Sequence, residues 1–147
     1  NPIMHQQKKV TGIGGIFFKT QDPTTTKNWY NKNMGISIDE WGAPFVQKKV
    51  SSSLDFSFLQ WSPMPFNTNY FFGDDQQFMI NYRVINIEEL VNKLKDAGCE
   101  ILDEMQSFEY GKFIHIRDVD GNAIELWEPI DSVFVEMYDG MDKVNFE

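Results

Sequence analysis

Two helix signatures repeat along the chain at nearly the same spacing, and this repeat constrains the fold more than any other feature. Asp22 followed by Pro23 is typical of an N-cap with proline at the first helical position, and Gly35 predicts the end of that helix. Asn86 and Gly98 bound a second predicted helix in the same way. The two caps lie 64 residues apart and the two glycines 63 residues apart, which indicates two related halves.

The second predicted helix has the clearer pattern. Asn86 with Glu89 three residues later predicts a capping box, in which the two side chains satisfy free backbone N–H groups at the helix start. Apolar residues then recur at steps of three and four and predict one buried helix face. They are Ile87, Leu90, Val91, Leu94 and Ala97.

Strand-like runs surround both helices in the same order. One run precedes each helix, at 13–20 and at 78–85. Three β-prone stretches follow the first helix, at 36–41, 44–50 and 54–61, and three follow the second, at 99–103, 112–118 and 122–127. The order βαβββ therefore occurs twice, which predicts an α+β domain of two tandem βαβββ modules.

We expect one domain at residues 8–130, with modules at about 10–61 and 78–128. Residues 62–77 form the predicted linker, and its aromatic side chains favour a segment that packs against the domain. Residues 131–147 show no clear period and form a C-terminal extension. Residues 1–7 are left out of the fold prediction.

Composition excludes several classes of function. The net charge of −9 is spread along the chain and repels phosphate backbones and anionic membranes, so nucleic acid is not expected as a partner. Cys99 is the one cysteine and cannot form an intramolecular disulfide, which favours a reducing cytoplasm. No apolar run reaches the roughly 20 residues that span a bilayer. Aromatic residues make up 15% of the chain, a proportion that suits an aromatic-lined pocket.

The segment 113–128, with sequence FIHIRDVDGNAIELWE, resembles the closing hairpin of vicinal-oxygen-chelate proteins, the superfamily of glyoxalases, bleomycin-resistance proteins and extradiol dioxygenases. The segment 17–36 is similar to the first strand and helix of that superfamily, and the resemblance covers about residues 10–130. The runs 13–18, 61–63 and 78–84 are similar to a glyoxalase-like subgroup. The resemblance implies that the two modules form a curved mixed sheet around one concave pocket.

The hairpin motif itself has a local physical reason. Asp120, Gly121 and Asn122 tolerate positive φ and therefore predict a tight turn between two antiparallel strands. The resemblance implies a role for Glu125, because this position supplies a carboxylate to a divalent metal in the superfamily. The alternatives for Glu125 are an inward carboxylate paired with a cation or bound to a ligand, and a catalytic base in an apolar cup.

Superfamily metal sites use four positions, which fall here on Gly15, Gln60, Met79 and Glu125. Gly15 has no side chain to offer, and the thioether of Met79 is a poor ligand for hard divalent ions. At most Glu125 and Gln60 remain as metal ligands. We therefore expect either no cofactor or a weakly bound divalent metal.

Period-2 geometry places Met79, Asn81 and Arg83 on one face of the strand at 78–85. If Met79 marks the pocket, Asn81 and Arg83 line it as well. Arg83 would then bind a carboxylate or phosphate of a small molecule, and the alternative is a salt bridge at the rim.

Aromatic residues of the same strands complete the predicted pocket. Phe17, Trp61 and Trp127 are candidates for ligand contact, although such residues also form ordinary cores. His115 alternates with isoleucines on a strand, a pattern typical of a surface or hydrogen-bonded structural histidine.

The resemblance leaves two functions open. The first is a pocket protein that binds or converts a small aromatic or carbonyl compound without a complete metal site. The alternative is a metal-dependent enzyme of the lactoylglutathione-lyase or dioxygenase type that uses Glu125. In either case the superfamily resemblance implies a homodimer, which would also shelter strand edges.

Overall fold

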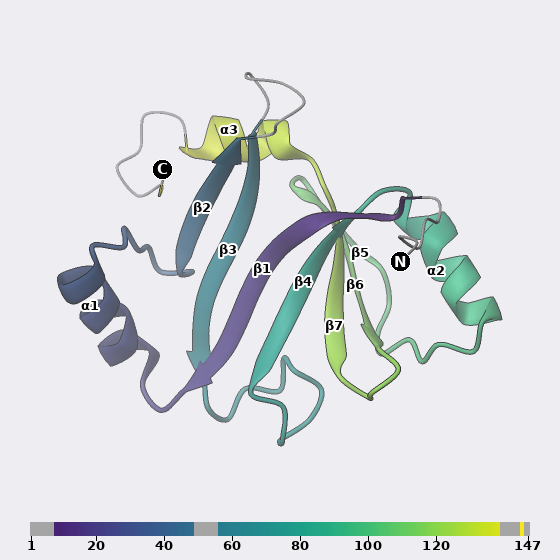
Figure 1. Cartoon of the computed structure of the whole chain (residues 1–147), viewed down its shortest axis with the longest axis horizontal. Coiled ribbons are helices and arrows are strands. Elements are labelled where there is room, and N and C mark those ends of the chain that lie inside the picture. The colour runs from purple at the N-terminus through teal and green to yellow at the C-terminus, as the bar shows by residue number, and fades with distance from the viewer. Residues whose placement is uncertain (1–7, 49–55, 139–144, 146–147) are drawn as a thin grey trace, which may run out of the picture.

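A computed structural model describes residues 8–48, 56–138 and 145, and its main feature is one curved, mixed, seven-stranded sheet (Figure 1). The strands are β1 (Val10–Thr20), β2 (Ala43–Lys48), β3 (Phe56–Pro65), β4 (Phe78–Val84), β5 (Gln106–Phe108), β6 (Gly111–Arg117) and β7 (Ala123–Pro129). The helices are α1 (Pro23–Met34), α2 (Ile87–Asp96) and α3 (Asp131–Tyr138). The predicted α+β class is confirmed.

The strand order is β2-β3-β1-β4-β7-β6-β5, so β1 and β4 occupy the middle of the sheet. β1 runs parallel to β3 and antiparallel to β4, and β4 runs parallel to β7. The register aligns one row of residues across five strands. Gln60, Gly15, Asn81, Glu125 and His115 are successive neighbours in this row.

The ends of α1 match the sequence prediction. The Asp22 side chain accepts hydrogen bonds from the backbone N–H groups of Thr24 and Thr25, at 3.1 and 3.3 Å. Pro23 is the first helical residue, and Gly35 adopts the left-handed conformation with φ 69°. The hydrogen bonds to the Asp22 carboxylate lower its pKa, with Thr25 contributing most.

The predicted capping box at the start of α2 is wrong. Asn86 lies in the left-handed region, with φ 51°, and its side chain makes no capping hydrogen bond. The carboxylate of Glu128 on β7 accepts the Ile87 N–H instead, at 3.0 Å, so a tertiary contact caps this helix. Ile87, Leu90 and Val91 are buried as predicted.

Two of the predicted strands are also wrong. Residues 36–41 contain only an isolated bridge between Asp39 and Gly42, and residues 99–103 only one between Ile101 and Ile116. Asp39 and Gly42 hydrogen-bond to each other through their backbone groups, at 2.7 and 3.3 Å, so the chain turns back at residues 40–41 and does not extend. The first half is therefore βαββ and the second βαβββ. Residues 49–50 and 54–55 of two further predicted strands lie outside the described residues.

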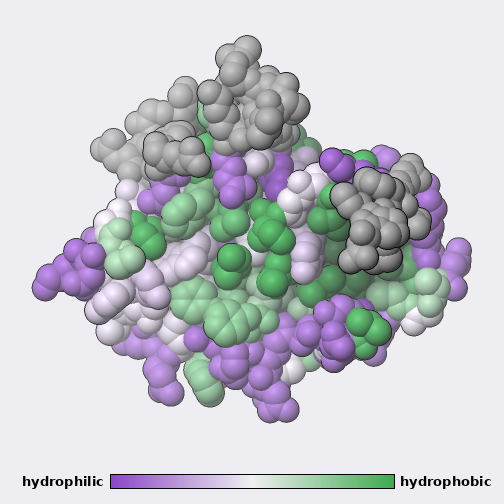
Figure 2. Space-filling model, viewed as in Figure 1, coloured by the Kyte–Doolittle hydropathy of each residue, from purple (hydrophilic) through white to green (hydrophobic). Residues whose placement is uncertain are grey.

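The helices α1 and α2 pack on the outer face of the sheet. α2 covers an apolar cluster on β4, β6 and β7 made by Val84, Ile114, Ile116 and Leu126. On α1, the Tyr30 ring contacts Trp61 of β3 at 5.0 Å between centroids. Apolar side chains remain exposed between the helices, over the middle strands, as Figure 2 shows.

The inner face carries the linker and α3. Phe71 of the linker is fully buried against Phe17 and Met79, so the segment packs down as expected. α3 lies across one end of the sheet (Figure 1), where Phe134 contacts Phe58 and Trp127 at 5.2 and 5.4 Å. Among the helices of the described ranges, none has the length and apolar character needed to cross a membrane.

Candidate functional site

A cavity of about 440 Å³ lies on the inner face of the sheet. It has a size and a mostly apolar lining typical of small-molecule sites. β1, β3, β4, β6, β7 and α3 all contribute residues to the wall. The lining residues are Gly14, Phe17, Trp41, Phe58, Gln60, Ser62, Met64, Tyr70, Asn81, Tyr110, Phe113, Glu125, Trp127, Phe134 and Met137.

One side of the cavity is an aromatic wall held in place by ring contacts. Trp127 stacks on Phe113 with centroids 5.5 Å apart, and Phe134 meets Trp127 edge to face. The Trp127 indole N–H donates to the Tyr110 carbonyl at 3.0 Å, which fixes the indole plane. These contacts hold the Trp127 ring in one orientation, so the wall is an ordered aromatic surface.

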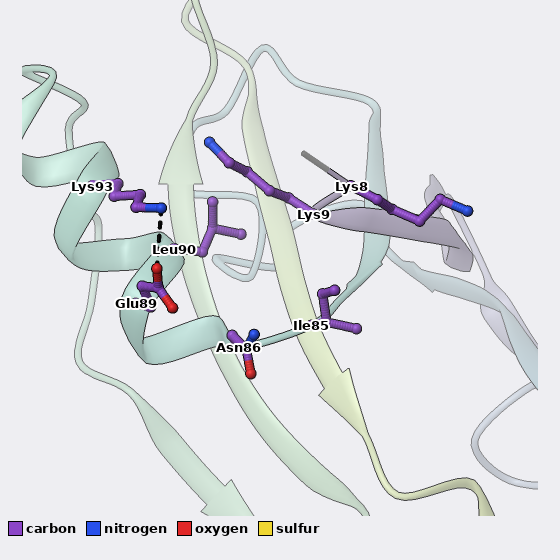
Figure 3. A pocket seen from close by; sticks show the side chains of 7 residues that line it. All are labelled: Lys8, Lys9, Ile85, Asn86, Glu89, Leu90 and Lys93. Atoms are coloured by element: carbon purple, nitrogen blue, oxygen red, sulfur yellow. Dashed lines mark ion pairs between the residues drawn. The ribbon is translucent and has the colours of Figure 1, made fainter. Parts of the chain in front are cut away.

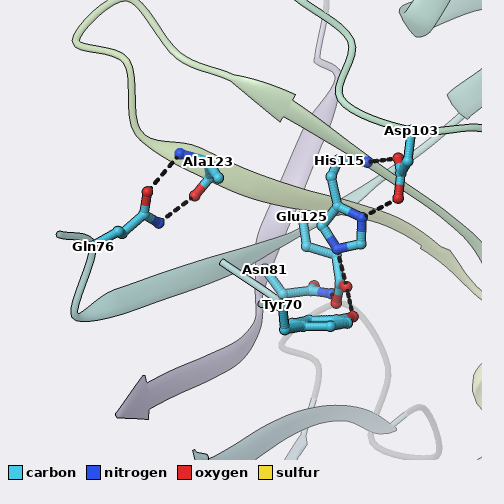
Figure 4. A network of polar contacts seen from close by, with 7 residues as sticks. All are labelled: Tyr70, Gln76, Asn81, Asp103, His115, Ala123 and Glu125. Atoms are coloured by element: carbon cyan, nitrogen blue, oxygen red, sulfur yellow. Dashed lines mark hydrogen bonds and ion pairs between the residues drawn. The ribbon is translucent and has the colours of Figure 1, made fainter. Parts of the chain in front are cut away.

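Glu125 lies at the polar end of the cavity with only 1% of its surface exposed. The Asn81 amide donates to one carboxylate oxygen at 2.6 Å, and the Tyr70 hydroxyl donates to the other (Figure 4). An isolated buried carboxylate is costly, and charge-assisted hydrogen bonds of this kind offset the cost. Glu125 is thus a buried carboxylate held in one orientation.

His115 is directly opposite Glu125 on β6 and is equally buried. Its Nε2 lies 2.7 Å from Glu125 Oε2, and its Nδ1 lies 2.6 Å from Asp103 Oδ2. The His115 backbone N–H also donates to Asp103, at 2.8 Å. Burial alone would lower the pKa of His115, but the hydrogen bonds and negative charges of Glu125 and Asp103 outweigh it and raise the pKa.

Tyr70 comes from the linker and reaches into the cavity. Burial of the hydroxyl, followed by the negative charge of Glu125, raises the pKa of Tyr70 well above its ordinary value. The phenol therefore stays protonated and serves as a hydrogen-bond donor to Glu125. Its ring lies edge-on to His115, with centroids 5.1 Å apart.

Gly14 permits the close packing of the polar end. A Cβ at this position would lie 2.4 Å from Asn81 Oδ1 and 2.8 Å from the Trp127 ring. Asn81 Oδ1 is buried and has no hydrogen-bond partner among the described residues. Asn81 Oδ1 is packed against Gly14, whereas the amide nitrogen of the same side chain holds Glu125.

The structure brings several sequence-predicted site residues together. Phe17, Gln60, Asn81, Glu125 and Trp127 all line the cavity. Their roles in binding or catalysis stay predictions.

Two other predicted ligand contacts lie elsewhere. Arg83 pairs with Asp131 and lies 5.2 Å from the Trp127 ring centroid, so the alternative salt bridge forms, but at a buried position and not at the rim. Trp61 points to the outer face, where it contacts Phe18 and Tyr30, because the inward side of β3 is taken by its neighbours in the pleat.

Counting from the helix caps placed the third metal position on Met79, whereas the strand register points to Asn81. Asn81 is the residue paired with both Gly15 and Glu125, whereas Met79 pairs with Phe17 and lies in the core. The reason is a shorter path from strand to helix in the second half. Gly15 precedes the first helical residue by eight positions, whereas Asn81 precedes it by only six.

Sequence reasoning missed Tyr70 and Asp103 and treated His115 as structural. The signal for His115 was available in the hairpin. The turn predicted at 120–122 forms, and its antiparallel register places residue 115 directly across from residue 125. No local pattern marks Tyr70 or Asp103, because each reaches the site by a tertiary contact.

The cavity does not fit the metal site of the superfamily. At Gly15 an added Cβ would lie 2.8 Å from the Phe17 ring, so that ring fills the space of the missing ligand. Both Glu125 oxygens already have hydrogen-bond partners, which a metal ion would have to displace. Within the described residues, no cluster of three or more His, Cys, Asp or Glu side chains could hold a metal ion.

A second pocket beside α2 lacks these features (Figure 3). Its volume is about 30 Å³, enough for water only. Its charged groups are Lys8, Lys9 and a Lys93–Glu89 pair typical of a helix surface. The aromatic cavity is the candidate site.

Comparison with known proteins supports the fold. No family model and no curated protein matches the sequence. Among solved structures, methylmalonyl-CoA epimerase from Mycobacterium tuberculosis is similar with a TM-score of 0.58 and 17% identity, over 90% of this chain and 97% of that chain. The Streptomyces coelicolor epimerase in complex with 2-nitronate-propionyl-CoA gives 0.59 and 15%, over 82% and 98%. A glyoxalase/bleomycin resistance protein/dioxygenase superfamily member from Vibrio splendidus 12B01 gives 0.50 and 13%, over 79% and 97%.

These likenesses, with the sheet topology and the inner cavity, define a glyoxalase-type α+β fold. The chain has the fold of the glyoxalase, bleomycin-resistance and dioxygenase superfamily, and the resemblance inferred from the hairpin motif is confirmed at this level.

Proposed function

We propose that the chain binds a small uncharged aromatic or carbonyl compound in the cavity and moves one of its protons with Glu125, without a complete metal site. The observation that carries this proposal is the position of Glu125, a buried and hydrogen-bonded carboxylate at the end of an aromatic cavity. A carboxylate held within reach of a bound substrate is suited to act as a general base or acid.

The charges around the cavity favour an uncharged ligand. No Lys or Arg occurs among the described residues that line it. Arg83, the nearest buried cation, is paired with Asp131. The net charge of −9 also repels anions. An acyl-CoA, which the Streptomyces coelicolor epimerase structure contains in analogue form, carries phosphates that this cavity gives no cation to meet.

The polar end of the cavity sets a requirement on the ligand. Glu125, Tyr70 and Asn81 lie at this end, and the rest of the wall is mostly apolar. The proposed ligand is therefore an apolar body with a carbonyl or hydroxyl group at the end that meets Glu125.

The test compound is 2-tetralone, an uncharged bicyclic ketone with acidic protons beside its carbonyl. Exchange of these protons for deuterium is followed by NMR in D₂O, beside binding measured by Trp fluorescence. We expect wild type to accelerate exchange and Glu125→Gln to lower the rate at least about 100-fold while binding is retained. Glu109→Gln, which changes an exposed acid adjacent in sequence to the cavity-lining Tyr110, is the matched control and is expected to behave as wild type.

Equal rates for wild type and Glu125→Gln would reject the acid–base role. Absence of saturable binding by 2-tetralone, together with tight binding of acetyl-CoA, would reject the ligand class.

A metal-dependent enzyme of the lactoylglutathione-lyase or dioxygenase type is the second candidate. The observation that favours it is the row of oxygen and nitrogen side chains Gln60, Asn81, Glu125 and His115 across the sheet. A divalent ion bound there would have to break the Glu125–His115 contact and would lack a ligand at Gly15. We therefore infer weak metal binding at most.

We also infer that two copies of the chain form a homodimer. Ile16, Phe78 and Ile80 are 38%, 64% and 38% exposed on the outer face, and a second copy of the chain would cover them. Sedimentation at micromolar concentration should give a dimer, and Ile80→Glu should give a monomer; a wild-type monomer would contradict the inference.

Three other inferences from the sequence stay proposals. They are the domain bounds 8–130, the two-module arrangement and a cytoplasmic location.

A further inference from the structure

We infer that Glu125 exchanges protons with solvent through His115 and Asp103, so that the three residues form a proton relay from the cavity to the edge of the sheet. This inference rests on the proposed acid–base role of Glu125. It adds an exit path for the proton and a constraint on the type of reaction.

The contacts from Glu125 through His115 to Asp103 form a continuous path. The two contacts of the His115 ring measure 2.7 Å to Glu125 and 2.6 Å to Asp103, one at each ring nitrogen (Figure 4). Imidazole can accept a proton at one nitrogen and release another from the second. Asp103 also binds the His115 backbone N–H, so the ring is held in the one orientation that joins both carboxylates.

The solvent exposure of the three side chains increases from Glu125 to Asp103. Glu125 and His115 are 2% and 5% exposed, whereas Asp103 is 25% exposed. The rings of Tyr70 and Phe72 lie 5.1 and 5.0 Å from the imidazole and shield it. Asp103 is therefore the residue of the relay that is accessible to solvent.

Asp103 opens into a separate pocket of about 270 Å³ beside α2. This pocket shares no lining residue with the aromatic cavity. Glu88, Lys95 and Glu104 surround Asp103 there, so the pocket is polar and wide enough for water. A ligand that fills the cavity would leave this exit open.

The relay moves one proton from the substrate to water and returns another by the same path. Glu125 takes a proton from the substrate and passes it to Nε2 of neutral His115, which becomes imidazolium. The imidazolium releases its Nδ1 proton to Asp103, which gives it to water, and the ring keeps a proton on Nε2. A proton returning from water through Asp103 to Nδ1 sends the Nε2 proton to Glu125 and then to the product. The hydrogen bonds and negative charges of Glu125 and Asp103, which raise the pKa of His115, stabilise the imidazolium once it has formed, and the relay operates in molecules whose His115 starts neutral.

The ring returns to its starting tautomer only when a proton comes back. The relay therefore suits a reaction that removes one proton and returns another, as an isomerisation or a carbon–hydrogen exchange does. It does not suit a reaction that only releases protons.

The test follows the His115 ring protons by NMR in protein labelled with ¹⁵N-histidine, with His115→Gln to assign them. Their exchange with water is measured without ligand. We expect Asp103→Asn to slow exchange of the Nδ1 proton, which faces Asp103 in the resting ring, at least tenfold, and Asp103→Glu to restore it. Glu104→Gln, which removes the neighbouring acid of the same pocket, is the matched control and should leave exchange unchanged.

Phe134→Ala provides an independent arm, because it widens the cavity and leaves the relay intact. The relay predicts no change in exchange for this variant. Faster exchange in Phe134→Ala, or an unchanged rate in Asp103→Asn, would overturn the relay. Neither outcome bears on 2-tetralone binding, so a failure of the relay and a failure of the proposed function are distinguishable.

Discussion

Removing the Tyr70 hydroxyl tests the network around Glu125 with little change in shape. Tyr70→Phe keeps the ring and its contacts with Phe17 and His115, at 6.1 and 5.1 Å, and deletes only the hydrogen bond to the Glu125 carboxylate. A hydrogen bond to a charged group contributes about 1.5–3 kcal/mol. We expect the free energy of unfolding to fall by about 2 kcal/mol, which corresponds to roughly 4–8 °C in Tm for a chain of this size.

Urea unfolding of a double-mutant cycle measures the effect. In the Glu125→Gln background the partner is neutral, so the cost of Tyr70→Phe should drop to about 1 kcal/mol, the value for a neutral hydrogen bond. Tyr30→Phe is the control, because its hydroxyl makes no hydrogen bond within the described ranges. A cost below about 0.5 kcal/mol for Tyr70→Phe, or an equal cost in both backgrounds, would refute the reasoning.

Three further predictions concern the same region. Because the pKa of His115 is raised on folding, protonated His115 stabilises the folded state fully below about pH 6.5, and this stabilisation is lost as the pH rises through the folded-state pKa. Urea titrations should therefore show a free energy of unfolding that declines over this pH range in wild type, and His115→Gln should remove the decline. Gly14→Ala places a Cβ 2.4 Å from Asn81 Oδ1 and should cost about 1–3 kcal/mol, with weaker 2-tetralone binding in fluorescence titrations. Asp131→Ala leaves Arg83 buried and unpaired and should cost about 3–5 kcal/mol in thermal unfolding; a loss under 1 kcal/mol would contradict this.

Local signals predicted the parts of the fold that local interactions determine. The Asp22 cap, the Gly35 stop and the Asp118–Asn122 turn all form between residues close in sequence. The start of α2 could not be predicted from local sequence. Glu128 on a distant strand caps this helix, and no sequence pattern around Asn86 indicates that contact.

The site was predictable to the extent that strand alternation determines it. Period-2 geometry places Asn81 on the same face as Met79 and Arg83, and the family resemblance implied an inward Glu125; both Asn81 and Glu125 line the cavity. Met79 was misplaced because counting from the caps assumes equal strand-to-helix paths, and the second path is shorter. Trp61 was misplaced because it lies on the opposite face of β3 from the cavity-lining residues of that strand. Tyr70 and Asp103 depend on how an irregular linker and loop fold back, which sequence spacing does not specify.

The most direct test of a metal-free role for Glu125 is deuterium exchange of 2-tetralone by protein stripped of metal, with elemental analysis of the same sample. We predict substoichiometric Ni, Zn, Mn and Fe before stripping and an exchange rate unchanged by EDTA or by added metal. Adding these metals should not produce lactoylglutathione lyase activity in a hemithioacetal assay. One tightly bound metal per chain, lost in Glu125→Gln together with an activity that only metal restores, would contradict the account.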